Sequence, residues 1–113
     1  MSREITISKA TGDWVVRSRG AILGESSAVL QLDEDGYEPV IYFPREDIEM
    51  AFLEPSDHRT TCPHKGEASY FDLMAKSGTV ANAVWSYENP KDAVREIAGY
   101  LAFDPKVAEV EQL

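Results

Sequence analysis

The sequence predicts a mainly β fold of the small barrel or sandwich-like type, with one short helix near the C-terminus. β-Branched and aromatic residues recur in short runs, and Gly, Pro, Asp and Ser separate these runs at regular intervals. Helical periodicity is confined to the stretch that follows residue 88. Many short strands at regular spacing are typical of all-β domains.

The expected strands are bounded by turn signals. Asp35-Gly36 between two apolar runs predicts a hairpin, and Gly20 and Gly78 mark two further turns. Pro39 places its strand at an edge or a strand start, because proline cannot donate to a ladder. Residues 48–53 fit a helix or a strand, and we favour a strand. The remaining expected strands are 4–7, 14–18, 21–26, 27–32, 38–43, 68–74, 79–87 and 100–103.

The expected helix begins at Asn89. Asparagine is a good N-cap, Pro90 fits the first helical position, and Asp92 complements the helix dipole. Apolar residues at 94, 97, 98 and 101 then recur at helical spacing. The tail at 106–113 is amphipathic and fits either a helix or a strand.

Length and composition suit one domain spanning residues 1–113. The chain is 43% hydrophobic and 27% charged, so it can bury a core. It has no apolar run of about 20 residues, as a membrane span needs, and no signal-peptide segment. Its single cysteine cannot form an internal disulfide, which fits a reducing compartment. The sequence therefore predicts a cytoplasmic protein.

The charge balance excludes two classes of partner. A net charge of −9, from 11 Lys and Arg against 20 Asp and Glu, repels nucleic acid and anionic membranes. Residues 58–65 differ, because they contain Arg59, Lys65 and both histidines but no acid. This small cationic island suits one anionic small molecule.

The most unusual composition lies between Thr61 and Gly66. The segment holds the only cysteine, a histidine, a proline and a Lys-Gly pair. Polar groups of several kinds next to turn residues are typical of a binding site carried by a loop.

Four motifs, taken in order, resemble a known family. They are Tyr-Phe-Pro-Arg-Glu-Asp at 42–47, Thr-Cys-Pro-His-Lys-Gly at 61–66, Trp-Ser-Tyr at 85–87 and Ile-Ala-Gly-Tyr-Leu-Ala-Phe at 97–103. Together they resemble the small bacterial family catalogued as domain of unknown function 427, which also carries a nucleotidyltransferase-like label.

The resemblance implies a β-rich domain of the β-tent type, similar in shape to ligand-binding and zinc-binding domains of eukaryotic regulators. Those zinc sites use two Cys-x-x-Cys pairs, whereas this chain has one cysteine, so neither a structural metal nor a cofactor is expected. The resemblance carries no substrate. The chain also lacks the clustered acids that would hold a catalytic Mg²⁺.

Two cations are candidates for binding an anionic group. Lys65 offers a point charge next to Gly66, where a backbone can approach a ligand, although the Walker A pattern is absent. Arg45 can fork onto a carboxylate or phosphate, and Asp47 can orient either cation. The structural alternatives are a solvated turn lysine and a helix-start cap.

Cys62 is a candidate nucleophile with His58 or His64 as its base. The structural alternative is a small buried apolar residue, as lone cysteines often are. A metal site formed by these three residues would lack the fourth ligand of a closed zinc site, and we expect none.

The aromatic residues Tyr70 and Trp85 are candidates for stacking on a planar ligand, while the other aromatic residues are expected in the core. The leading hypothesis is therefore a domain that binds a small, anionic or planar ligand. The alternatives are an enzyme, acting by nucleotidyl transfer or through Cys62, and a homodimerising interaction module. The candidate ligand-binding residues are Arg45, Asp47, Thr61, Cys62, Lys65, Tyr70 and Trp85.

Overall fold

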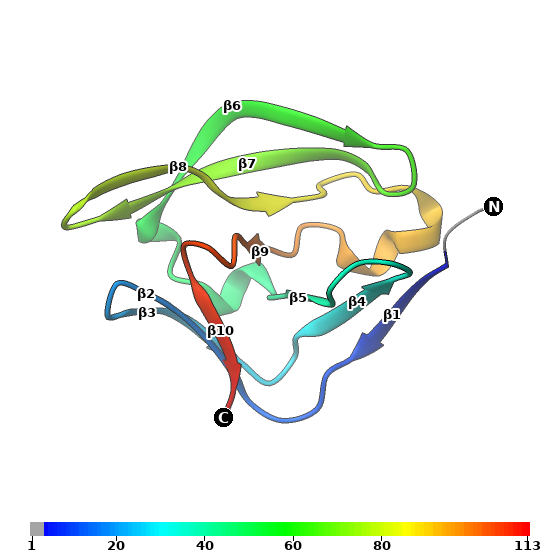
Figure 1. Ribbon diagram of the computed structural model, residues 1–113, viewed down its shortest axis with the longest axis horizontal. Coiled ribbons are helices and arrows are strands. Elements are labelled where there is room, and N and C mark those ends of the chain that lie inside the picture. Colours follow the sequence, from blue (N-terminus) through cyan, green and yellow to red (C-terminus); the bar gives the residue numbers. More distant parts are fainter. Residues whose placement is uncertain (1–3) are drawn as a thin grey trace.

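The protein is mainly β, as the sequence predicts, and a computed structural model describes residues 4–113. Figure 1 shows the strands with three short 3-10 helices between them. No helix among the described residues is long and apolar enough to cross a membrane. The strands are β1 (Ile5–Lys9), β2 (Trp14–Ser18), β3 (Ala21–Ser26), β4 (Leu30–Glu34), β5 (Val40–Tyr42), β6 (Leu53–Cys62), β7 (Gly66–Ala75), β8 (Gly78–Ser86), β9 (Ala102–Phe103) and β10 (Glu109–Gln112). The 3-10 helices are η1 (Arg45–Asp47), η2 (Met50–Phe52) and η3 (Asp92–Ile97).

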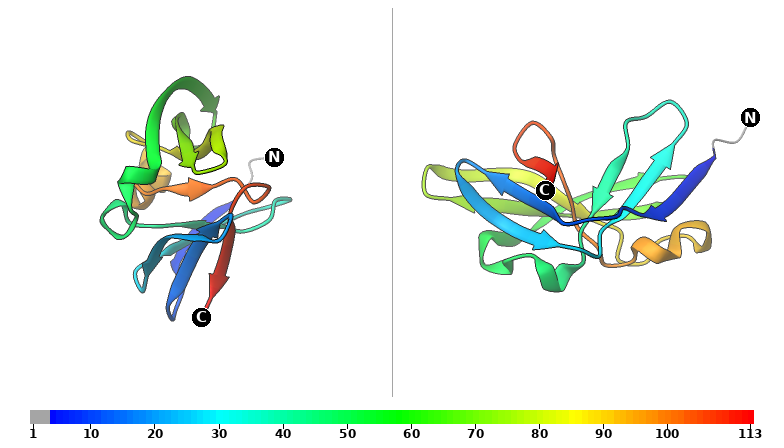
Figure 2. Two further views of the ribbon diagram at one scale, coloured as in Figure 1. Left: turned by 90° about the vertical axis from the view of Figure 1, so that its left-hand side faces the viewer. Right: turned by 90° about the horizontal axis from the view of Figure 1, so that it is seen from below.

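The strands form three antiparallel sheets, with orders β1-β4-β5, β10-β2-β3 and β6-β7-β8-β9. Figure 1 and the left view of Figure 2 show β6, β7 and β8 together as one layer, with the N-terminal strands and β10 on one side of it. The barrel expectation is wrong, because none of the sheets in the described chain closes. Phe43 and Leu101, next to β5 and β9, form one isolated bridge, and Gly24 of β3 forms another with Ile48. Pro44 follows the first bridge and cannot extend a ladder.

The predicted hairpins are confirmed. β4 pairs with β5 around the Asp-Gly turn, and β2 pairs with β3 through a two-residue turn at Arg19 and Gly20. Both turn residues have positive φ values, 51° and 85°, as a type I′ turn requires. β7 pairs with β8 through Lys76 and Ser77. The tail is the strand alternative, since β10 pairs with β2.

The predicted C-terminal helix is not confirmed as an α-helix. The segment is the six-residue 3-10 element η3, interrupted at Val94 with φ of −127°. Its flanks are held from outside, because Lys91 donates its amide to the carbonyl of Lys65 and Gly99 donates to Tyr87. The apolar side chains that it buries, Val94 and Ile97, are three residues apart, which matches the 3-10 repeat.

Two further expectations need correction. Residues 48–53 are mostly not a strand, because Ile48 forms one bridge and η2 follows it. The segment Thr61–Gly66 is less of a loop than predicted, since β6 runs through Cys62 and leaves a turn of only Pro63 to Lys65.

The core consists of two clusters that share the strands of the four-stranded sheet. β7 contributes to both, because Phe71 and Leu73 lie in one cluster and Ala68 lies in the other. Neighbouring Tyr42 and Phe43 divide in the same way. The cluster of Ala68 and Tyr42 has polar aromatic residues at its border, and a cavity opens there.

Candidate functional site

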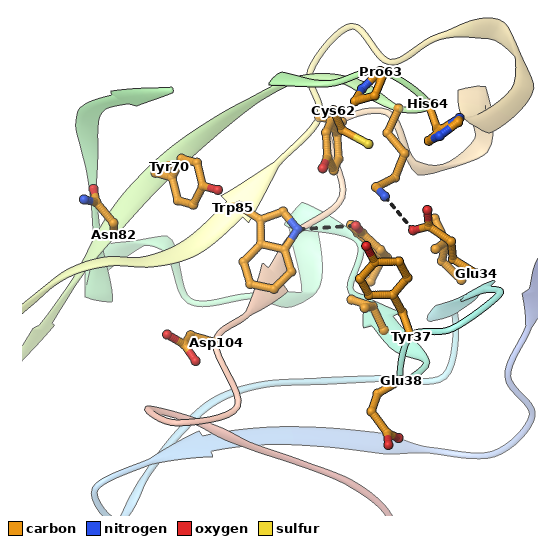
Figure 3. Close-up of a pocket in the computed structure, with 15 residues that line it drawn as sticks. Glu34, Tyr37, Glu38, Cys62, Pro63, His64, Tyr70, Asn82, Trp85 and Asp104 are labelled. Atoms are coloured by element: carbon orange, nitrogen blue, oxygen red, sulfur yellow. Dashed lines mark hydrogen bonds and ion pairs between the residues drawn. The ribbon is translucent and has the colours of Figure 1, made fainter. Parts of the chain in front are cut away.

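A cavity of about 950 Å³ lies between the β4–β5 hairpin and the strands β6 to β8. Its size is within the usual range for small-molecule sites. Figure 3 shows the lining side chains with Trp85 near the middle. Glu34, the ion-pair partner of Lys65, lies at one end, and Asn82 and Asp104 lie at the other.

Hydroxyl-bearing aromatic residues form much of the wall. Four of the five tyrosines and one of the two tryptophans line the cavity, and none of the four phenylalanines does, all of them within the described residues. β7 and β8 place Tyr70 directly opposite Trp85 in register, so their side chains share a face. The tyrosines are Tyr37, Tyr42, Tyr70 and Tyr87.

The aromatic wall is organised by specific contacts. The Trp85 indole N–H donates to the Tyr42 hydroxyl over 3.3 Å, and the hydroxyls of Thr60 and Tyr70 are hydrogen-bonded at 2.9 Å. His58 contacts the Tyr70 ring edge-on, with ring centroids 4.7 Å apart. Burial raises the pKa of Tyr42 and the pKa of Tyr87 to about 12 each. Both phenols are therefore neutral donors at physiological pH.

An ion pair closes one end of the cavity. Lys65 Nζ lies 2.9 Å from Glu34 Oε1, and the two side chains are only 13% and 9% exposed. Burial lowers the pKa of Lys65, but the hydrogen bond and charge of Glu34, together with Cys62, outweigh burial and raise it. Glu34 thus keeps the Lys65 ammonium protonated, and the negative carboxylate balances its positive charge.

Cys62 lines the same end as a partly buried free thiol. It is the last residue of β6 and pairs with Gly66 across the turn. Lys65 donates its amide to the Cys62 carbonyl over 3.3 Å. Because the turn is so short, the thiol and the ammonium face the same cavity, together with His64.

The other end of the cavity is built on an irregularity in β8. Asn82 has a left-handed φ of 54°, a conformation that asparagine tolerates better than most residues. Asp72 holds this kink by accepting the Asn82 amide at 2.9 Å, and Ser56 donates to the Asn82 side chain. Asp104 reaches this end from the segment after β9, where its amide is bound by the Ala83 carbonyl.

The structure brings together only part of the predicted site. Cys62, Lys65, Tyr70 and Trp85 line the cavity. Thr61 does not, since it lies exposed on β6 opposite Glu67.

Arg45 and Asp47 are also outside the cavity. Asp47 accepts a hydrogen bond from the Ser26 hydroxyl at 2.6 Å. Arg45 donates to the carbonyl of Gly99 and the hydroxyl of Ser86, and it pairs with Glu88 at 2.9 Å. Both charged groups therefore tie separate segments together.

Sequence reasoning missed the acidic residues of the cavity. Glu34 and Glu38 flank the Asp-Gly turn of the β4–β5 hairpin, and Asp104 lies far along the chain. The only local signal was the acidic hairpin turn. Its sequence does not differ from that of an ordinary solvent-exposed turn. Among residues 4–113, no group of three or more His, Cys, Asp and Glu side chains is arranged to hold a metal ion.

Arg45 gives a stability prediction. Its guanidinium also lies over the Phe71 ring, 5.4 Å from the centroid. Arg45→Met keeps the apolar stem but removes all three hydrogen bonds, so we expect the free energy of unfolding to fall by about 1–2 kcal/mol. Urea denaturation measures this change.

The control is Arg95→Met. Arg95 forms an exposed pair with Asp92, and the loss there should be under about 0.5 kcal/mol. Equal losses in the two variants would contradict the structural role of Arg45.

Comparison with known proteins gives a family without an assigned activity. The sequence model described as domain of unknown function (DUF427) matches residues 6–113. A search of curated proteins found no match.

Proposed function

We propose that the cavity beside Trp85 binds a small planar ligand. The chain belongs to the family described as domain of unknown function (DUF427). One observation carries the proposal. The polar aromatic residues are concentrated around a single cavity, whereas the phenylalanines are not among its lining residues as the structure describes them. Aromatic side chains with hydroxyl or N–H groups bind flat molecules by stacking while their polar ends fix the orientation.

The charges of the cavity favour a neutral or cationic ligand over an anionic one. Glu34, Glu38 and Asp104 line it, against Lys65 as the one Lys or Arg among the described lining residues. The Lys65 ammonium is already paired with Glu34. Arg45, the other cation predicted to bind an anion, is paired with Glu88. A positively charged ligand would meet the carboxylates of Glu38 and Asp104 and the negative faces of aromatic rings.

Cys62 supports a second candidate function. Its sulfur lines the cavity near Lys65, which is the kind of position that a thiol-based reaction requires. A ligand stacked on Trp85 would then also be a substrate. Nucleotidyl transfer and a homodimeric interaction module remain alternatives that no particular contact favours.

The test compares two flat, two-ring ions of opposite charge, 1-methylquinolinium and 2-naphthoate, by isothermal titration calorimetry. We expect the cation to bind at least about fivefold more tightly. Glu38→Gln combined with Asp104→Asn should weaken cation binding by about three- to tenfold. Trp85→Leu should weaken the binding of both ions about tenfold, because stacking is lost.

The matched control is Glu96→Gln with Glu109→Gln, which removes the same charge from exposed positions outside the cavity. It should leave both affinities within about twofold. Equal binding of the two ions would refute the charge argument, and an unchanged affinity in Trp85→Leu would refute the site. A covalent adduct on Cys62 after incubation with a ligand would instead support the second candidate.

A further inference from the structure

A second cavity has a volume of about 650 Å³. It is formed between the tips of the β2–β3 and β7–β8 hairpins, with Phe52 of η2 at its side. Figure 1 shows both hairpin tips on the same side of the molecule. None of its lining residues lines the first cavity, so a ligand here would be distinct from the one proposed above.

The floor of this cavity is apolar. Leu23 is 2% exposed and Leu73 is 1% exposed, and Ala21, Phe52, Met74 and Ala75 complete the apolar lining. The nearby hydroxyl groups are engaged within the protein. Ser18 donates to the Val107 carbonyl over 2.7 Å, and Ser77 accepts from Arg19. A ligand that enters must therefore bring apolar surface.

The mouth of the cavity is positive. Arg19 comes from the turn between β2 and β3, and Lys76 comes from the turn between β7 and β8. The hydrogen bond from Arg19 to Ser77 holds the guanidinium across the gap between the two tips. The structure thus presents two cations, one from each hairpin, over a single apolar space.

The charge of this cavity is the opposite of that of the chain. The protein carries a net charge of −9, yet none of the described lining residues here is acidic. In a strongly acidic protein, a site with two cations and no acid attracts an anionic head group. The concave shape favours a single molecule, and the overall negative charge repels an anionic bilayer.

We propose that this second cavity binds an anionic amphiphile, namely a single alkyl chain with a terminal carboxylate. The alkyl chain lies on Leu23, Leu73 and Phe52, where it leaves water. The carboxylate lies at the mouth between Arg19 and Lys76. The alkyl chain matches the apolar floor, and the carboxylate matches the positive mouth. Neither alkyl alcohols nor alkyl ammonium ions match both.

Isothermal titration calorimetry below the micellar concentration tests both parts. Octanoate, decanoate and dodecanoate should bind with increasing affinity, by up to roughly fourfold for each methylene that becomes buried. Decanoate should bind at least about tenfold more tightly than decyltrimethylammonium. Affinity that does not change with chain length, or equal affinity for the two decyl ions, overturns the proposal.

Substitution of the two exposed cations at the mouth tests where the carboxylate binds. Arg19→Asn with Lys76→Gln should weaken decanoate binding by about three- to tenfold, and asparagine suits the positive φ of 51° at this position. The matched control is Lys9→Gln with Arg95→Gln, which changes the net charge equally at exposed positions outside both cavities. Equal losses in the two double variants overturn the assignment.

Vesicles of phosphatidylcholine and phosphatidylglycerol separate a soluble amphiphile from a membrane surface. We expect no co-sedimentation of the protein with these vesicles, together with saturable decanoate binding. Co-sedimentation without decanoate binding overturns the proposal in favour of membrane docking. Since the aromatic cavity is untouched by the variants, its binding of 1-methylquinolinium should persist, so the two proposals fail independently.

Discussion

Replacing Gly24 by alanine lowers the free energy of unfolding by about 3 kcal/mol. A Cβ at this position would lie 2.5 Å from the Asp47 carbonyl oxygen, 2.5 Å from Ile48 Cδ1 and 3.1 Å from Ile48 Cα. Two of these atoms belong to the backbone, so rotation of a side chain cannot relieve the clash. The new methyl group must push β3 away from the segment that follows η1.

The displaced contact is a structural joint. Gly24 and Ile48 form an isolated bridge that joins β3 to the segment after η1. The Glu49 amide donates to the Leu23 carbonyl over 2.8 Å at the same place. Ile48 is only 5% exposed, so its side chain has no open space to enter. The loss therefore combines overpacking with weakened hydrogen bonds.

Urea denaturation of Gly24→Ala, compared with that of Gly20→Ala, identifies the cause of the lost stability. Gly20 has a positive φ of 85°, and a Cβ there would meet nothing within 4 Å. Gly20→Ala should thus lose about 1 kcal/mol through backbone strain alone. If Gly24→Ala loses no more than this control, the close approach of the two segments is wrong.

The parts of the fold that could be predicted from sequence are those with local causes. The β2–β3, β4–β5 and β7–β8 hairpins form at turns whose residues fix the backbone, and each strand pairs with its neighbour in the chain. An α-helix is not confirmed here, and the spacing of Val94 and Ile97 fits both helix types. The element is also bounded by long-range contacts that the local pattern does not show, such as the bond from the Lys91 amide to the Lys65 carbonyl, 26 residues away.

The residues of the candidate site were also predictable only where local contacts place them. Cys62, Lys65, Tyr70 and Trp85 come from consecutive strands and their turn, so local pairing brings them together. Arg45 could not be assigned from sequence, because its partners Ser86, Glu88 and Gly99 lie on segments 41 to 54 residues away. The charge of the cavity was missed for the same reason, since Glu34 and Asp104 enter it from separate elements.

Raising the pH from about 8 to about 11 lowers the free energy of unfolding by about 3 kcal/mol, and the buried phenols of the aromatic cavity are the main cause. The pKa of Tyr42 and that of Tyr87 are each about 12 in the folded protein, against an ordinary value of 10.0. Above pH 10 the unfolded chain loses these protons while the folded protein keeps them, so unfolding becomes more favourable. At about pH 11 each phenol contributes about 1.4 kcal/mol.

Lys65 acts in the same direction. Its pKa is raised above 10.5, so its contribution to stability is present below that value and is lost as the pH rises through the folded pKa. Urea titrations at the two pH values measure the total. Tyr42→Phe should remove about half of the loss in the free energy of unfolding between the two pH values. Tyr42→Phe combined with Tyr87→Phe should remove most of it. A pH dependence that survives both substitutions would contradict the burial of these two phenols as its cause.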